Sequence, residues 1–311
     1  MIYFNKLLFV KIPYFTKTKM SLINRIFPIL LIILLFHSCS IFEPPAQIPA
    51  FIHIDSIGLK VDSLTQGTAS HKIVDAWVYV DQNLVGVYEL PSTIAVLASG
   101  VHEVDIKAGI LVDGIKATRE AYPFYTFYSQ NVNLSPQQVT KINPVVTYYS
   151  GIPFTWIEDF EKPGITMQTV SSSYDTLIKT ATNVFEGIYS AYVGLSSVAN
   201  KNYFEYNTSN IYILPTDGSH SVFLEMNYMG TNSIRVGVLP IASPNNTAFS
   251  DDTVLNINPS SKWNKIYVDL TSVCGSYPTA FGFKIFIAAA LDPGLNNSEI
   301  YFDNLKLICQ H

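Results

Sequence analysis

The chain has 311 residues, a formal net charge of −5 and 48% hydrophobic residues, including 19 Tyr and 19 Phe. This length suggests two domains, and the apolar content is sufficient for two buried cores. The 19 Lys and Arg residues form no basic patch after residue 38, which argues against a nucleic-acid partner, because binding to phosphates requires clustered basic side chains.

The first 38 residues have the composition of a signal peptide. They contain five basic residues and no acidic one, and their apolar run, Ile26–Phe36, is too short to span a bilayer. Translation from Met20 instead of Met1 would give a signal peptide of ordinary length. Without residues 1–38 the mature chain would have 273 residues and, with five fewer positive charges, a net charge of about −10.

A cysteine directly follows this signal-like segment. The sequence Phe36-His37-Ser38-Cys39 resembles the lipobox of bacterial lipoproteins, with the best match at its last two residues. The resemblance implies cleavage before Cys39, acylation of Cys39 with palmitate-type chains, and stable anchoring to a membrane. Ser40 at the next position favours the outer membrane, where the protein would face either the cell surface or the periplasm. The alternative is an ordinary signal peptide followed by an incidental cysteine.

A tether and a first β-domain follow the cysteine. Residues 39–50 contain three prolines and no apolar periodicity, which predicts a stiff, extended tether that begins at the lipidated cysteine. From residue 51 onward, apolar and polar residues alternate in short runs that are bounded by turn residues. This pattern predicts a β-sandwich over residues 51–150, in which Trp77 and Val78, for example, lie on opposite faces of one strand.

Within this domain, residues 75–108 resemble PEGA-type surface modules and related immunoglobulin-like repeats. Those modules have a short hairpin, a G-x-x-x-x-P step and a G-x-H-x-V sequence that leads a strand. These features are present here, in the same order, as Val80-Asp81, Gly86–Pro91 and Gly100–Val104. The resemblance implies an immunoglobulin-like sandwich, and we interpret His102 in the second motif as a structural residue.

Residues 151–311 resemble the jelly-roll (galactose-binding-like) modules of carbohydrate-binding families. Such modules commonly open with an acidic "DFE" strand and close with an "iyfDNl" strand, and this segment opens with Trp156–Gly164 (WIEDFEKPG) and closes with Ser298–Ile308 (SEIYFDNLKLI). No amphipathic helix of ten or more residues is expected after Ala50. The predicted fold class is therefore all-β, with two β-sandwich domains, the first immunoglobulin-like and the second a jelly roll. The same frame also serves adhesive and protease-associated modules, so it does not fix a function.

The jelly-roll resemblance also implies a structural calcium ion between the first and last strands of the domain. Oxygen ligands suit calcium, and the ligands carried over here would be Glu161 and Asp303, completed by backbone carbonyl groups. The alternative is that Asp303 and Asn304 cap the end of their strand through hydrogen bonds. No cofactor for catalysis is expected, and neither the histidines nor the cysteines have the spacing of metal ligands.

After Cys39 the chain has two cysteines, Cys274 and Cys309. Export to an oxidising compartment would permit a disulfide between them. Two separate thiols are the alternative.

Four predicted strands of the second domain carry a mixed set of outward-facing side chains. Alternation with apolar residues assigns the following residues to the solvent side: Glu225, Asn227, Arg235, Tyr267, Asp269, Lys284 and Phe286. If these strands lie side by side on a concave sheet, the set combines aromatic rings with planar polar groups, as a sugar site requires. The alternative is a solvated sheet face with cross-strand ion pairs.

Catalysis finds little support in the sequence. It contains no nucleophile elbow, zinc-protease motif, P-loop or dinucleotide fingerprint. Glu158 and Asp159 are neighbours on one predicted strand and point to opposite faces, so they make a poor pair for glycoside hydrolysis. We therefore predict a cell-envelope lipoprotein that is not an enzyme and that acts as a binding or adhesion module, with glycan as the favoured ligand. The alternative is an accessory subunit of an envelope protein complex.

Overall fold

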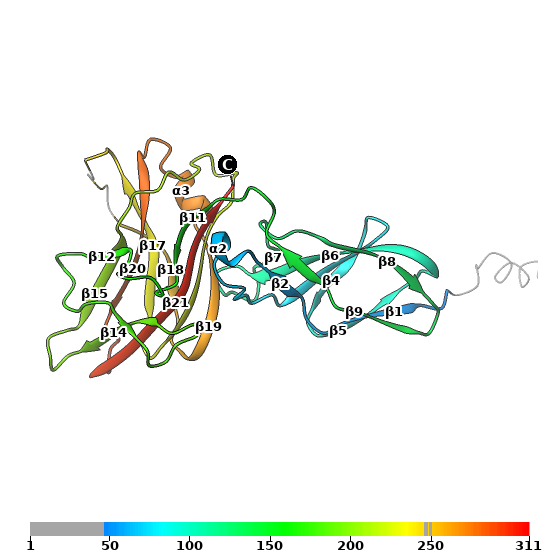
Figure 1. Ribbon diagram of the computed structural model, residues 1–311, viewed down its shortest axis with the longest axis horizontal. Helices are drawn as coiled ribbons and strands as arrows, with labels where there is room; N and C mark the ends of the chain where they lie inside the picture. Colours follow the sequence, from blue (N-terminus) through cyan, green and yellow to red (C-terminus); the bar gives the residue numbers. More distant parts are fainter. Residues whose placement is uncertain (1–46, 246–247, 249–250, 311) are drawn as a thin grey trace, which may run out of the picture. The chain divides into compact units, whose positions relative to one another are not determined.

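The computed structural model describes residues 47–245, 248 and 251–310. The predicted signal peptide, the lipidation site Cys39 and most of the tether lie outside the described residues. Within the described part of the chain, strands dominate, and the two helices, α2 (Ser63–Gln66) and α3 (Thr271–Gly275), have only four and five residues (Figure 1). No helix of this part is long and apolar enough to cross a membrane. The prediction of an all-β fold is confirmed.

The first sandwich consists of a five-stranded sheet and, facing it, a layer of two smaller sheets. Its strands are β1 (Ala50–Ile54), β2 (Gly58–Lys60), β3 (Asp75–Val80), β4 (Asn83–Glu89), β5 (Ser92–Val96), β6 (Gly100–Leu111), β7 (Arg119–Ala121), β8 (Tyr128–Leu134), β9 (Val139–Ile142) and β10 (Val145–Thr147). One sheet has the order β4–β3–β6, and both β7 and β8 pair with β6. The facing layer contains a three-stranded sheet of order β5–β1–β9 and a two-stranded sheet of β2 and β10. The pairs β1–β9 and β2–β10 are parallel, whereas the other pairs of this sandwich are antiparallel.

The residue pattern of β3 explains how these strands face the core. Val78 and Val80 are buried, whereas Trp77 and Tyr79 are only half-buried. This is the alternation that a strand with one buried face requires, and it confirms the faces predicted from the sequence.

The second sandwich has the jelly-roll arrangement of two antiparallel sheets. Its strands are β11 (Phe154–Glu158), β12 (Met167–Thr169), β13 (Ile178–Thr180), β14 (Ser190–Ser196), β15 (Tyr203–Thr208), β16 (Val222–Gly230), β17 (Ile234–Ile241), β18 (Asp252–Ile257), β19 (Ser260–Asp269), β20 (Gly282–Ala290) and β21 (Asn297–Cys309). The six-stranded sheet has the order β13–β14–β21–β16–β19, and β11 pairs with β21 as well. The five-stranded sheet has the order β12–β15–β20–β17–β18.

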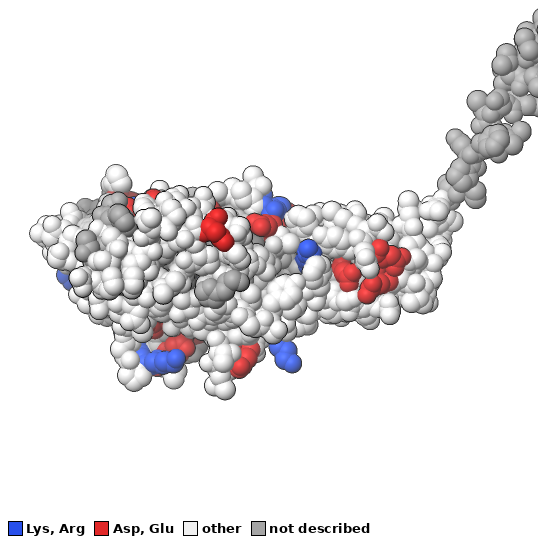
Figure 2. All heavy atoms as spheres, turned by 90° about the horizontal axis from the view of Figure 1, so that it is seen from above, with Lys and Arg blue, Asp and Glu red and all other residues white. Residues whose placement is uncertain are grey.

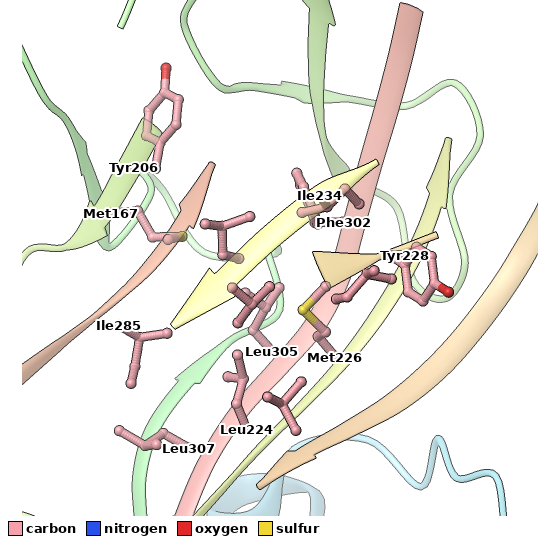
Figure 3. Packing of buried hydrophobic residues seen from close by; sticks show 14 of the residues in the cluster. Met167, Tyr206, Leu224, Met226, Tyr228, Ile234, Ile285, Phe302, Leu305 and Leu307 are labelled. Carbon is pink, nitrogen blue, oxygen red and sulfur yellow. The ribbon is translucent and has the colours of Figure 1, made fainter. Parts of the chain in front are cut away.

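Apolar side chains from both sheets meet between them to form the core of the second sandwich. Leu224 and Met226 project from β16, Ile285 projects from β20, and Phe302 and Leu307 project from β21 (Figure 3). All five are buried. Interdigitated side chains of this kind hold the two sheets face to face.

The two sandwiches share a continuous apolar contact, which we call the joint. Phe223, Tyr267 and Ile308 belong to strands of the second sandwich but are packed in the core of the first. The backbone of Tyr267 forms a parallel bridge with Val112, next to the end of β6. Residues 49–311 accordingly form one compact unit, and the domain boundary predicted at residue 150 falls in the segment between β10 and β11.

Candidate functional site

The structure divides the seven predicted ligand-binding residues between two sheets. Glu225, Asn227, Tyr267 and Asp269 lie on β16 and β19 of the six-stranded sheet, and Arg235, Lys284 and Phe286 lie on β17 and β20 of the five-stranded sheet. In both sheets these side chains are on the face opposite the core, as alternation predicted. The seven residues do not, however, share one surface.

The four residues of the six-stranded sheet lie in the joint. Glu225, Asn227 and Tyr267 are at most 1% exposed, because the first sandwich covers them. Ser70 Oγ donates a hydrogen bond to Asn227 Oδ1 at 2.8 Å, and the backbone N–H of Lys72 donates to the Tyr267 hydroxyl at 2.9 Å. The expectation that these three residues face solvent is therefore wrong. Because they are buried, they cannot contact a glycan in this arrangement.

The fourth residue, Asp269, is half-buried and also belongs to the contact between the sandwiches. Its backbone N–H donates to Asp113 Oδ1 at 3.0 Å, and the N–H of Asp113 donates to the carbonyl of Tyr267 at 2.9 Å. The β6–β7 turn of the first sandwich is thereby fixed to β19.

Glu225 is the electrostatic centre of the joint. Its Oε1 accepts hydrogen bonds from the hydroxyls of Tyr122 at 2.9 Å and Tyr148 at 2.8 Å, and its Oε2 lies 2.7 Å from Lys265 Nζ. Burial alone would raise the pKa of Glu225, but the charges of Lys265 and Lys306 outweigh this effect and bring the pKa below its usual value. Glu225 is therefore a buried, ionised acceptor that joins both sandwiches.

Lys306 occupies the neighbouring position on β21 and is also buried. Its ammonium group donates to the backbone carbonyl of Thr68, in the segment that follows α2. Burial lowers the pKa of Lys306 to about 8, against the attraction of Glu225. Glu225, Lys265 and Lys306 thus serve the contact between the sandwiches.

The three predicted residues of the five-stranded sheet differ in accessibility. Phe286 is completely buried and Lys284 is 6% exposed. The ring of Phe286 packs against Gly237, its partner on the neighbouring strand β17. A Cβ atom added to Gly237 would lie 2.8 Å from the Phe286 ring. Arg235 remains half-exposed and donates to the hydroxyl of Tyr203 at 3.2 Å. A buried Phe286 cannot serve as a platform for a sugar ring.

The open part of the six-stranded sheet carries a row of aromatic side chains that the sequence analysis did not single out. We call Tyr192, Tyr301, Trp263 and Phe185 the aromatic row. The ring centroids of Tyr192 and Tyr301 are 5.1 Å apart, those of Tyr301 and Trp263 are 6.5 Å apart, and those of Trp263 and Phe185 are 5.7 Å apart. Phe185 is 40% exposed, Tyr192 and Trp263 are half-buried, and Tyr301 is buried beneath its neighbours.

The strands explain why these rings meet. Tyr192 on β14 and Tyr301 on β21 are direct cross-strand partners, and cross-strand partners project from the same face of a sheet. The next residue in register on β16 is Met229, which pairs with Tyr301. Trp263 reaches the row from β19, at the far side of β16. On β19, Trp263 is two positions from Lys265 and four positions from Tyr267, which lie in the joint.

Gly194 shapes one end of the aromatic row. An added Cβ at this position would lie 2.6 Å from the Tyr192 hydroxyl oxygen. The absence of a side chain therefore lets the Tyr192 ring lie along its own strand. Polar groups accompany the rings: the Tyr301 hydroxyl donates to Glu299 Oε2 at 3.1 Å, and burial together with Glu299 raises the pKa of Tyr192.

The loop that presents Phe185 is held by the two predicted calcium ligands. The backbone N–H groups of Phe185 and Glu186 each donate to Asp303 Oδ2 at 3.2 Å. Glu161 Oε1 accepts the N–H groups of residues 188–189, both at 2.9 Å. The two carboxylates therefore position this loop beside the aromatic row.

This geometry bears on the predicted calcium site. Asp303 Oδ1 accepts the N–H of Asn304 at 2.8 Å, so both of its oxygens already serve as caps for backbone groups, which is the alternative considered above. Burial raises the pKa of Asp303 to about 7, and the nearby charge of Glu161 adds to this shift. The described residues contain no group of three or more His, Cys, Asp or Glu side chains arranged to hold a metal ion. Calcium at Glu161 and Asp303 stays a prediction.

Cys274 and Cys309 are both buried in the core of the second sandwich. In the described structure no disulfide joins them. Burial raises the pKa of Cys274 to about 12, and Cys309 Sγ lies 3.3 Å from Thr155 Oγ1. The structure corresponds to the alternative of two separate thiols.

The face shown in Figure 2 carries few charged groups, and most of its surface is neither acidic nor basic. This agrees with a charged-residue content of only 14%.

No protein-family model matches the sequence, and no curated protein matches it. Among solved structures, the chain is similar to the CBM22-1 xylan-binding domain of Paenibacillus barcinonensis Xyn10C, with 11% identity over 51% of this chain and 94% of that chain and a TM-score of 0.34. It is also similar to the C-terminal family 22 carbohydrate-binding module of Clostridium thermocellum Xyn10B, with 12% identity over 50% of this chain and 92% of that chain and a TM-score of 0.33.

A third similar structure comes from the carbohydrate-binding modules of the β-sandwich superfamily. The match has 12% identity, covers 85% of this chain and 99% of that chain, and has a TM-score of 0.37.

Proposed function

We propose that the protein is a non-catalytic binding module of the bacterial cell envelope, anchored by a lipid at Cys39, that holds a glycan on the aromatic row. The observation that carries the glycan assignment is the contiguous set of Tyr192, Tyr301, Trp263 and Phe185 on the open part of the six-stranded sheet. The anchor rests on the lipobox resemblance at Cys39.

The chemistry of the aromatic row suits a sugar. The faces of aromatic rings carry partial negative charge, so they attract the C–H groups on the flat side of a pyranose ring. A site of this kind also needs a few polar groups that fix the orientation of the ligand. Glu299 at the Tyr301 hydroxyl supplies a carboxylate for sugar hydroxyls.

The test is a binding assay of the mature chain against a broad panel of polysaccharides and oligosaccharides. We expect the wild type to bind one class of glycan and the Trp263→Ala variant to bind it about 30-fold more weakly, since losing a central tryptophan contact costs about 2 kcal/mol. The matched control is Tyr174→Ala, which removes a 59% exposed ring outside the aromatic row. Equal loss in both variants, or no binding to any glycan, would reject the proposal.

The second candidate function is that of an accessory subunit of an envelope protein complex. β4 is an edge strand of the first sandwich, and Leu84 and Val87 on it are 52% and 39% exposed. An open edge with apolar side chains can accept a strand from another protein. Cross-linking from Val87 in cells, followed by identification of one stoichiometric partner, would favour this function over glycan binding.

Localisation in the outer membrane is part of the proposal, and the direction in which the protein faces decides between the two ligand classes. Proteolysis of intact cells should remove residues 152–311 if the protein faces outward. If the wild-type protein is protected from the protease, and a Cys39→Ala variant is released from the membrane fraction, the protein faces the periplasm.

A further inference from the structure

The end of the first sandwich where the tether arrives is defined by five strand termini. β1 begins there at Ala50, which pairs with Val96 at the end of β5. β9 also begins there, because Val139 pairs with Phe51 in parallel. β6 begins and β8 ends at the same end, since Gly100 pairs with residue 134. The opposite end of this sandwich contacts the second sandwich through the joint.

Three large apolar side chains at this end are mostly exposed. Leu97 follows the last residue of β5 and is 66% exposed, Val101 is the second residue of β6 and is 70% exposed, and Val139 is the first residue of β9 and is 60% exposed. They come from both layers, so they surround the end of the sandwich instead of lying along one face. We call them the apolar rim.

We propose that the apolar rim rests on the lipid surface to which the protein is anchored, with these three side chains inserted between the lipid head groups. The proposal rests on the proposed lipid anchor at Cys39. The occupant is identified by the length of the intervening chain. Ten residues lie between Cys39 and Ala50, so the eleven steps from one Cα atom to the other span at most ~36 Å at about 3.3 Å per step. The apolar rim is therefore confined to a thin layer next to the membrane.

Because of this confinement, a surface with weak affinity for lipid is sufficient to keep the apolar rim on the membrane. A short tether turns a second contact into an intramolecular one, with an effective concentration in the millimolar range. Three aliphatic side chains could not hold a soluble protein on a bilayer by themselves, but they can do so at that effective concentration. The rim thus fixes the orientation of the protein, whereas the acyl chains supply the attachment.

The charges near the rim determine which lipids it accepts. Asp81 at the β3–β4 turn and Glu103 on β6 lie at this end, and acidic groups gather on the first sandwich in the view of Figure 2. His102 pairs with Asp81 at 2.6 Å and neutralises it only when the imidazole is protonated. We therefore expect neutral lipid to accept the rim better than anionic lipid does, with a difference that salt reduces.

The experiment places an environment-sensitive fluorophore on the rim of the lipidated, full-length mature protein in phosphatidylcholine vesicles. Leu97→Cys or Val139→Cys carries the fluorophore, and Val198→Cys, at an 88% exposed position in the second sandwich, is the matched control. We expect a blue-shifted emission and quenching by lipid-attached nitroxides at 97 and 139 but not at 198. Phosphatidylglycerol in the vesicles should weaken the signal at low salt.

Three results would overturn the proposal. The first is emission at 97 and 139 that remains typical of water while the protein co-floats with the vesicles. The second is a blue shift that depends on protein concentration and not on lipid, which would indicate contact between copies. The third is an unchanged signal at 139 when Leu97 and Val101 are both replaced by Ser. Failure to co-float at all would instead reject the anchor, and with it the proposed function.

Discussion

Replacing Glu225 by Ala tests whether the joint is a structural centre of the protein. The change removes the acceptor of two tyrosine hydroxyls and leaves the buried ammonium groups of Lys265 and Lys306 without their counter-charge. Breaking a buried ion pair by removing one partner costs about 3–5 kcal/mol. That is a large fraction of the roughly 5–15 kcal/mol that stabilises a folded domain.

The assay is equilibrium unfolding in urea, followed by tryptophan fluorescence and circular dichroism. The wild type should unfold with one transition, because the core of the first sandwich includes residues of the second. The Glu225→Ala variant should lose at least about 3 kcal/mol or unfold in two steps. The double variant Glu225→Met with Lys265→Met should recover part of the loss, since apolar replacements of a buried pair are often tolerated. A Glu225→Ala variant within about 1 kcal/mol of the wild type would refute this account of the joint.

Three further predictions concern the second sandwich. Gly194→Ala should weaken glycan binding by displacing the Tyr192 ring while leaving the unfolding free energy nearly unchanged; unchanged affinity would contradict the role of Gly194. The pKa of Asp303 in the folded protein is raised to about 7, so its contribution to stability is fully present below about pH 4 and is lost as the pH rises through 7. The difference in unfolding free energy between the wild type and Asp303→Asn should therefore shrink from pH 4 to pH 7. A difference that does not change with pH would refute this assignment. Cys274 and Cys309 should resist a thiol reagent in the native protein and both react after denaturation without reductant, whereas unreactive cysteines in the denatured chain would reveal a disulfide.

The strands could be predicted from the sequence, because a strand with one buried face has an apolar residue at every second position. The faces of β3, β16 and β19 follow directly from which residues are apolar, and the structure agrees with them. Which strands become neighbours does not follow from this period. β17 and β20 were grouped with β16 and β19, but long-range pairing assigns them to the other sheet.

The candidate site was misplaced for a related reason. Alternation identifies a side chain such as Glu225 as pointing away from its own core, but it cannot show that a second sandwich covers that face. A polar residue in a joint and a polar residue in a ligand site give the same pattern. Continuing the outward set of β19 by one step, from Lys265 to Trp263, would have identified one member of the aromatic row.

The most direct test of glycan binding at the aromatic row is to follow the three indole N–H signals by nuclear magnetic resonance. The glycan that binds best would be added to the wild type, with the three signals assigned by single Trp→Phe replacements. The account predicts that the signal of Trp263 shifts with the glycan concentration, while those of Trp77 in the first sandwich and Trp156 in the core stay in place. A glycan that binds and leaves Trp263 unmoved would contradict the account, since its site would then lie elsewhere.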